Sequence, residues 1–381
     1  MRTRSLALVC AGASLALVLA ACSSSNKSSN GSGGSGTGGS ATGGNGGSST
    51  GGSSGSSGSG GTTGGSGGTA GSGGSSGGSG GSSGGSGGSS SSLPSIGGCT
   101  VFTGNDDWNK DISGEGVDAT WTQRIQNIVG NINIHPDYKP PDYGIPINVV
   151  AASQAKVPIT FDQYANESDP GPYPFPSPSV AKIEGGTPQS CSGDCHVLVV
   201  QQGTCMLYEG WACSYKSGGW VCGNGATWDL TKLSYGQRPM GWTSADAAGL
   251  PIMPGLVRYA EVQAGAINHA IRFTLECSMN KYVKPATHVA AHGSCGSNAP
   301  PMGLRVRLKA SYDISGLTKG AQVVLEAMKK YGMILADNSS PNGNFYFQGE
   351  VNPNWKGADI SALKTVPASA FEVVTPPPLQ P

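Results

Sequence analysis

Glu209 is the carboxylate whose surroundings most favour chemistry. The run Cys205–Cys213 alternates, which places Glu209 on the same face as Leu207 and Trp211. A charged group among apolar neighbours either pairs with a cation or has a raised pKa, and raised pKa values are typical of catalytic acids. Trp211 offers an aromatic ring on which a sugar can stack, and Trp228 is a second candidate close in the sequence.

Hydrolysis of a glycosidic bond needs a second carboxyl group about 5–10 Å from the first, so that one acts as acid and the other as nucleophile or base. Asp229 and Glu261 are the candidates for this second group, since they fall on neighbouring strands if the strand order is simple. The alternative is that Glu209 has no catalytic role and forms an ion pair with Arg258 or Arg272.

Four cations predict a basic face on a sheet. Arg305, Arg307 and Lys309 alternate with apolar residues and therefore share one side of a strand, and Arg272 faces away from the apolar side of its own strand. If these strands are neighbours, the resulting ladder suits a carboxylated or sulfated glycan. The alternative is a solvated outer face on which the same cations pair with acids.

The histidines and the short motifs indicate no established catalytic machinery. His269 lies on an apolar face and is expected to be a hydrogen-bonded core residue. His288 and His292 lie in a predicted strand or loop, where a spacing of four does not bring them together as it does on a helix. Residues 292–296 (HGSCG) predict a turn pinned by a disulfide. Walker, HExxH and, outside the glycine-rich segment, GxSxG motifs are absent, and we expect no metal and no cofactor.

The stretch Gly241–Leu275 organises the elements that position these residues. Thr243 and Asp246 have the spacing of a helix cap, and glycine and proline turns follow. From Ile267 to Leu275 apolar and other residues alternate, which predicts a strand with one buried side.

Further short strands with turn signals between them favour a sandwich or barrel. The predicted strands are Ile145–Ala151, Val157–Phe161, His196–Gln201, Cys205–Ser214, Ala226–Leu230, Leu256–Tyr259, Tyr282–Ala290, Leu304–Ser311, Met333–Ala336, Phe345–Gln348 and Phe371–Val374. One helix is predicted after Thr318, with Lys329 and Lys330 in its last turn. The fold class we predict is mainly β, a jelly-roll-like β-sandwich with one short helix near the C-terminus.

The N-terminus predicts export. Arg2 and Arg4 precede an apolar run that is too short to span a membrane and that ends in LAAC at Cys22. This pattern resembles the lipobox of bacterial lipoproteins, in which the cysteine is acylated after the preceding peptide is removed. The resemblance implies a signal peptide over residues 1–21, lipidation of Cys22 and anchoring to a lipid bilayer, at the outer membrane or cell surface. The alternative is an ordinary secretory signal with a cysteine there by chance.

Residues 22–97 are almost entirely Gly, Ser and Thr, a composition that predicts a disordered tether. Residues 98–381 form the predicted domain, which is long enough for a substantial core. All 23 acidic residues lie in it together with 20 of the 23 basic ones. This balance excludes the basic footprint of a nucleic-acid-binding protein, and we expect a monomer without a nucleic-acid partner.

Eight cysteines in the domain, beyond an export signal, predict disulfides. The dense group Cys191–Cys222 is expected to close two bridges within itself, but spacing does not determine the connectivity. The alternative for residues 191–196 (CSGDCH) is a set of metal ligands, which an oxidising compartment disfavours.

Three long motifs resemble a family of secreted bacterial proteins, common in soil bacteria, to which no function is assigned. They are GWTSADAAGLPIMPGLVRYAEVQAGAINHAIRFTL at 241–275, GLRVRLKASYDISG at 303–316 and KKYGMILADN at 329–338. The resemblance covers roughly residues 145–374 and implies an extracellular, β-rich domain, without carrying over any catalytic residue.

Together these patterns predict a cell-surface lipoprotein whose β-sandwich domain engages extracellular polysaccharide and either cuts it, as a glycoside hydrolase or polysaccharide lyase, or only binds it. A structural or adhesive envelope protein is the third possibility.

Overall fold

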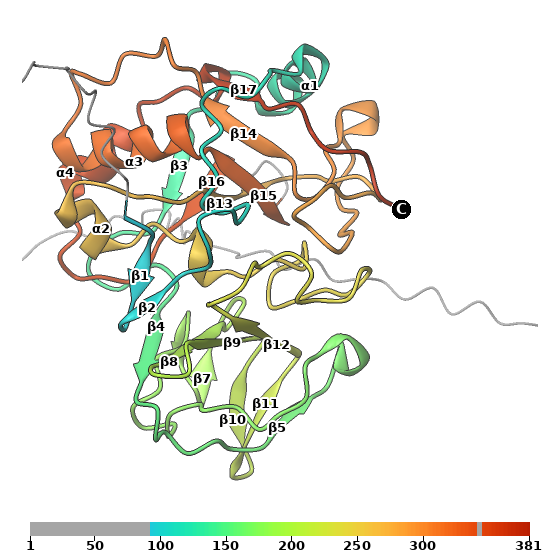
Figure 1. Cartoon of the computed structure of the whole chain (residues 1–381), viewed down its shortest axis with the longest axis vertical. Helices are drawn as coiled ribbons and strands as arrows, with labels where there is room; N and C mark the ends of the chain where they lie inside the picture. The colour runs from blue at the N-terminus through green and yellow to red at the C-terminus, as the bar shows by residue number, and fades with distance from the viewer. Residues whose placement is uncertain (1–91, 341–344) are drawn as a thin grey trace, which may run out of the picture. The chain divides into compact units, whose positions relative to one another are not determined.

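The computed structural model describes residues 92–340 and 345–381, so the predicted signal peptide, Cys22 and most of the predicted tether lie outside the described residues. The described part is mainly β (Figure 1), which confirms the predicted fold class. Its strands are β1 (Ser95–Ile96), β2 (Cys99–Thr100), β3 (Ile134–Asp137), β4 (Ile147–Val150), β5 (Ile159–Phe161), β6 (Gly186–Thr187), β7 (Ser190–Cys191), β8 (Val197–Gln201), β9 (Met206–Trp211), β10 (Ser214–Lys216), β11 (Gly219–Cys222), β12 (Asn224–Asp229), β13 (Ile271–Leu275), β14 (Arg305–Leu308), β15 (Met333–Asn338), β16 (Phe345–Gln348) and β17 (Phe371–Val373). Its helices are α1 (Ala119–Val129), α2 (Tyr259–Ala264), α3 (Lys319–Lys330) and α4 (Gly357–Leu363), with 3₁₀ turns η1 (Ala165–Glu167), η2 (Met253–Gly255), η3 (Gly296–Asn298) and η4 (Ala368–Ala370).

A four-stranded sheet in the order β12-β9-β8-β4 separates two hydrophobic cores. Successive side chains of a strand point to opposite faces. Leu198 and Leu207 accordingly pack in the larger core, while Val199 and Tyr208 pack in the smaller one. The smaller core also contains Trp220 of a three-stranded sheet in the order β10-β11-β5. This packing of strands on both sides of a core is consistent with the predicted sandwich.

The six-stranded sheet has the order β17-β14-β15-β13-β16-β3 and mixes directions. Its central strand β13 pairs parallel with β15 and antiparallel with β16, whereas the predicted jelly roll suggested antiparallel pairing. All five residues of β13 are buried, so the prediction of a strand from Ile267 with an outward face was wrong. The predicted strands Leu256–Tyr259 and Tyr282–Ala290 contain only isolated bridges.

Helix α3 confirms the helix predicted after Thr318. Val324 and Met328 are buried, and the two lysines occupy its last turn. It contacts β14 and α4, and Figure 1 shows α3 and α4 beside the six-stranded sheet. The expectation of a single helix was wrong, because α1, α2 and α4 also form; α1 begins after Asp118, whose carboxylate accepts a hydrogen bond from the Trp121 N–H.

Four disulfides hold the loops that surround the four-stranded sheet and the end of β13. Two of them close within the dense cysteine group, as predicted, and the last pins the turn at residues 292–296. They join Cys99 to Cys205, Cys191 to Cys195, Cys213 to Cys222 and Cys277 to Cys295. No helix among the described residues has the length and apolar character needed to cross a bilayer.

Candidate functional site

A cavity of about 310 Å³ lies where the ends of β9, β12 and β15 meet three loops. We call it the Trp211 cavity. Its lining residues are Tyr164, Trp211, Asn224, Thr243, Ser244, Ala245, Ala247, Asn280, His288, Val289, Ala290, Ala291, His292, Asp337 and Asn338. This volume is at the lower end of the range of small-molecule sites, about 300–1,000 Å³.

Strand pairing places the aromatic wall of the cavity. Trp211 is opposite Asn224 in the antiparallel ladder of β9 and β12, so both side chains leave the same face at the end of the sheet. Tyr164 packs against Trp211 with ring centroids 6.1 Å apart. The predicted alternation along β9 is confirmed here, because Leu207 and Trp211 both pack on the larger core.

Two amide oxygens on the cavity wall are buried without a hydrogen-bond partner among the described residues. They are the Oδ1 atoms of Asn224 and Asn338. In each residue the NH₂ group donates to a loop carbonyl, that of Ser244 or that of Ala290, which fixes the orientation of the amide. An unsatisfied buried acceptor costs roughly 1–3 kcal/mol. Both oxygens are closed to solvent, so neither is open to a ligand in the cavity without a shift of the surrounding side chains.

Asp246 and Arg272 form a buried ion pair behind the cavity. Arg272 Nη2 donates to Asp246 Oδ1 at 2.7 Å and Nε donates to Oδ2 at 3.1 Å. The two side chains are 0% and 3% exposed. Burial acts to lower the pKa of Arg272, but Asp246 raises it above its ordinary value, so the guanidinium stays charged. The helix cap predicted at Thr243 and Asp246 was wrong, because no helix begins there and the Asp246 carboxylate bonds to Arg272 instead.

A bulge in β15 directs Asp337 toward this ion pair. Phe273 is opposite Leu335, but the next residue, Thr274, is opposite Asp337, so β15 contains one extra residue. An extra residue moves the following side chains to the other face of the strand. Asp337 consequently shares a face with Arg272, and its Oδ2 lies 4.0 Å from the Arg272 Nη2.

Asp337 is the one carboxylate among the described residues that line the cavity. Its side chain is 21% exposed. Burial, followed by the negative charge of Asp246, raises the pKa of Asp337 to about 7, while Arg272 opposes the rise and Asp194 adds to it. A carboxyl group with this pKa is protonated in part at neutral pH, as a general acid must be.

Glu209 is completely buried and anchors the turn that precedes α2. Its carboxylate accepts hydrogen bonds from the backbone N–H groups of Ile252, at 3.0 Å, and Met253, at 2.8 Å. Burial raises the pKa of Glu209 to about 7, and these two hydrogen bonds counteract the rise. Glu209 does not line the Trp211 cavity, and it pairs with neither of the arginines considered from the sequence.

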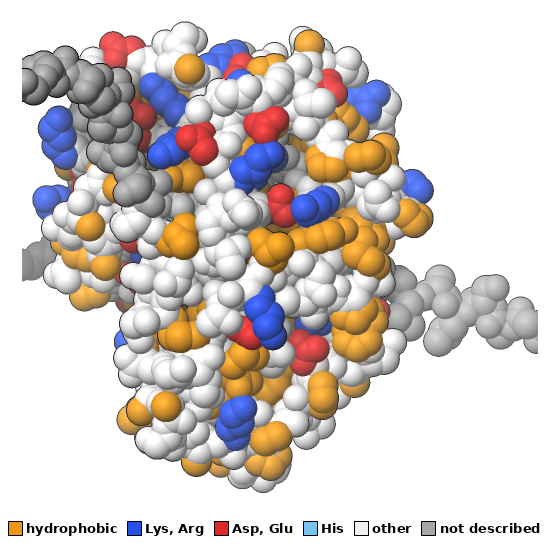
Figure 2. All heavy atoms as spheres, viewed as in Figure 1, with side chains coloured by type: hydrophobic (Ala, Val, Ile, Leu, Met, Phe, Trp, Pro, Cys, Tyr) orange, Lys and Arg blue, Asp and Glu red, His pale blue; other side chains and the backbone are white. Residues whose placement is uncertain are grey.

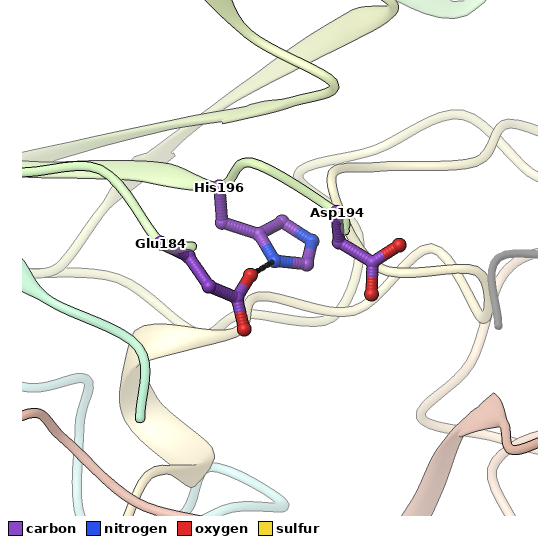
Figure 3. A group of neighbouring side chains, drawn as sticks. All are labelled: Glu184, Asp194 and His196. Carbon is purple, nitrogen blue, oxygen red and sulfur yellow. Dashed lines mark hydrogen bonds and ion pairs between the residues drawn. The ribbon is translucent and has the colours of Figure 1, made fainter. Parts of the chain in front are cut away.

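Glu184, Asp194 and His196 form a second polar group (Figure 3), which is hydrogen-bonded to the wall residues Trp211 and Ala245. His196 Nδ1 lies 2.5 Å from Glu184 Oε2, and its Nε2–H donates to the Ala245 carbonyl at 3.1 Å. Burial acts to lower the pKa of His196, but Glu184 raises it to about 9. The Trp211 indole N–H donates to Asp194 Oδ1 at 3.5 Å.

Asp229 and Glu261 are not brought together with Glu209. Glu209 is opposite Ala226, and Asp229 lies three residues further along β12, so it points to the opposite face. Lys232 and a neighbouring threonine hold its carboxylate at a turn and lower the pKa of Asp229. Glu261, in α2, accepts hydrogen bonds from Arg258, the residue before the helix, and from His269, in the loop after it.

The other predicted contact residues are placed as follows. Trp228 is 2% exposed and lies in the larger core. Arg305 donates to the Tyr331 carbonyl, and Arg307 pairs with Glu372 at 2.8 Å. Strand β15 separates β14 from β13, so these arginines form no continuous ladder with Arg272. On the face drawn in Figure 2, Lys and Arg side chains are scattered among Asp and Glu rather than gathered in a patch.

The histidines fall into two groups. His269 is buried and hydrogen-bonded, which confirms the expectation of a core residue. His288 and His292 lie in a loop, and both line the cavity. The disulfide between Cys191 and Cys195 excludes those sulfurs as metal ligands, but it closes the loop that carries Asp194.

Sequence reasoning missed most of the cavity. Asp337 and Asn338 end the motif KKYGMILADN, yet they were assigned no role, because a bulge cannot be inferred from alternation alone. Asn224 was not singled out from the sequence, because its position opposite Trp211 depends on the pairing of β9 with β12, which are separated in the chain by β10 and β11. No family model, curated protein or solved structure matches this chain.

Proposed function

We propose that this chain is a cell-surface lipoprotein whose β domain binds extracellular polysaccharide in the Trp211 cavity and cleaves it with Asp337 as proton donor. The observation that carries the proposal is a cavity in which the Trp211 ring lies together with the polar side chains of Asp337 and Asn338. Sugar hydroxyl groups form hydrogen bonds with such side chains, while the apolar face of a sugar ring packs on an indole.

The lining of the cavity favours a neutral glycan over an anionic one. Among the described residues that line it there is no lysine or arginine, and one carboxylate, Asp337, is present. The ionised form of Asp337 would repel a carboxylated or sulfated sugar, and no lysine or arginine among the described lining residues would offset this repulsion. The proposal therefore departs from the basic ladder expected from the sequence.

For hydrolysis, Asp337 supplies the proton and a second carboxylate is required. Asp194 is the candidate, because it influences Asp337 electrostatically and contacts Trp211. Asp246 and Glu209 are less suitable, since both are completely buried and hydrogen-bonded to Arg272 or to backbone N–H groups.

The test of cleavage is the release of reducing ends from a panel of neutral polysaccharides. Asp337→Asn is expected to lower the rate by about 10²–10⁴-fold, the contribution of a positioned general acid. Asp229→Asn is the matched control, because Asp229 is an aspartate outside the cavity. Equal rates for wild type and Asp337→Asn would contradict the assignment. Retention on glycan without any product would favour the binding-module alternative. Unsaturated uronate absorbance with a uronate-containing polysaccharide added to the panel would favour a lyase.

The anchoring part of the proposal rests on LAAC at residues 19–22 and on the resemblance to secreted bacterial proteins. In a bacterial host, Cys22→Ser is expected to move the protein from the membrane fraction to the soluble fraction. An unchanged distribution would contradict acylation of Cys22.

A further inference from the structure

We propose that Glu184, Asp194 and His196 form a binding site for a divalent metal ion beside the wall of the Trp211 cavity. The inference stands on the geometry of these three residues and is independent of the glycan proposal.

The three side chains bring two oxygen donors and one nitrogen donor close together. One potential ligand atom from each residue lies within 4.8 Å of the other two. An ion bound at 2.0–2.6 Å from its ligands separates opposite ligands by roughly 4–5 Å. Figure 3 shows the His196 ring between the two carboxyl side chains.

The orientation of His196 is that of a metal ligand held by an outer hydrogen bond. A carbonyl oxygen only accepts, so the 3.1 Å contact with Ala245 places a proton on Nε2 and directs Nδ1 at Glu184. Metal-binding histidines commonly donate their other N–H in this way to a backbone carbonyl. The imidazole is nearly fully buried, with 3% exposure, which limits its freedom to turn.

The backbone holds the carboxylates in place independently of one another. Asp194 lies in the loop closed by the Cys191–Cys195 disulfide, and its carbonyl accepts from the Ala212 N–H at 2.8 Å. The Glu184 N–H donates to the His196 carbonyl at 3.1 Å. The site is thus built from three ordered backbone positions rather than from long surface side chains.

The charges around the site favour an added cation. Asp137 interacts electrostatically with Glu184 and with Asp194, and Asp194 interacts with Asp337. The neighbouring guanidinium, Arg272, contacts Asp246 through one edge, made by Nε and Nη2, and also interacts electrostatically with Glu184. A bound ion would take the place of the proton between His196 Nδ1 and Glu184 Oε2. These two atoms would then move apart, from 2.5 Å to the distance between two ligands of one ion.

Two carboxylates and one imidazole suit zinc or manganese better than magnesium, which prefers oxygen and water. Three protein ligands leave further positions of the ion open to water. If the chain is also a hydrolase, Asp194 would serve as a ligand of the ion, and a metal-bound water would take the second role in hydrolysis.

The test is isothermal titration of the chelator-treated full chain with Zn²⁺, Mn²⁺ and Ca²⁺. We expect one ion per chain for zinc or manganese, with an affinity at least tenfold weaker in Glu184→Gln and in Asp194→Asn. Asp229→Asn is the matched control: it removes an aspartate outside the donor set and outside the Trp211 cavity, so its affinity should stay within about threefold of wild type. Absence of binding by all three ions, or equal affinity in Asp194→Asn, would overturn the proposal.

A second measurement does not depend on the folding of the variants. Crystals of the wild-type protein soaked in Mn²⁺ should show an anomalous peak among the three donor groups. A peak elsewhere, or none, would overturn the site. If glycan cleavage survives treatment with a chelator, the proposed function stands and the ion has no part in its mechanism. If Asp337→Asn loses glycan cleavage but still binds the ion, the metal site stands on its own.

Discussion

Asp246→Asn tests the buried ion pair on which the arrangement of the site depends. The variant keeps the shape of the side chain but leaves the charged guanidinium of Arg272, 3% exposed, without its counter-ion. Removing one partner of a buried pair costs about 3–5 kcal/mol. Asp337, whose Oδ2 is 4.0 Å from the Arg272 Nη2, compensates in part. We therefore expect a loss near the lower limit, about 3 kcal/mol.

The loss is measured by urea unfolding at pH 7, followed by circular dichroism. For a domain of this size, about 3 kcal/mol corresponds to a lowering of Tm by roughly 6–12 °C. The control is Glu372→Gln, which breaks the ion pair between Glu372 and Arg307. The exposed fractions of these two side chains are 18% for Glu372 and 11% for Arg307. Partly solvated pairs contribute about 0–1 kcal/mol. The reasoning is refuted if Asp246→Asn loses less than about 1 kcal/mol, or no more than the control.

Three further results are expected. The pKa of Asp337 is raised from 3.8 to about 7, so its contribution to stability is complete below pH 4 and is lost as the pH rises through 7. Unfolding curves from pH 4 to 8 should therefore show Asp337→Asn gaining stability relative to wild type. Curves for the two proteins that run parallel over this pH range would contradict the expectation. Cys205→Ser opens a bridge across 106 residues and should cost about 2–5 kcal/mol in urea unfolding, whereas a loss under 1 kcal/mol would argue against the bridge. Glu209→Gln keeps an acceptor for the two backbone N–H groups, so cleavage and glycan binding should stay within about twofold of wild type; a rate loss of 10²-fold without unfolding would restore Glu209 as a catalytic candidate.

The elements that follow local patterns could be predicted from the sequence. Alternation over Cys205–Cys213 correctly placed Glu209 with Leu207 and Trp211, because the side-chain period of a strand is a local property. The helix after Thr318 followed from its apolar spacing. Helix α1 was missed, since Ala119–Val129 lies in a region otherwise rich in turn residues.

The cavity depended on contacts that local patterns do not contain. Asp246 has the spacing of a cap, but its partner Arg272 is 26 residues away in β13. Asp337 faces the cavity only because β15 carries an extra residue opposite β13. The outward orientation predicted for Arg272 assumed a half-exposed strand, whereas β13 is central in its sheet and buried on both faces.

The most direct test of the account is a calorimetric titration of the wild-type protein and Trp211→Ala with an oligosaccharide of the polysaccharide that the wild type retains best. Trp211 lines the cavity, and Trp228, in the core, does not. We predict saturable binding of a neutral oligosaccharide by the wild type and at least a tenfold loss of affinity in Trp211→Ala, with unfolding curves that remain cooperative. Equal affinity in the folded variant, or tighter binding of sulfated than of neutral glycans by the wild type, would contradict the central claim that this cavity recognises a neutral sugar.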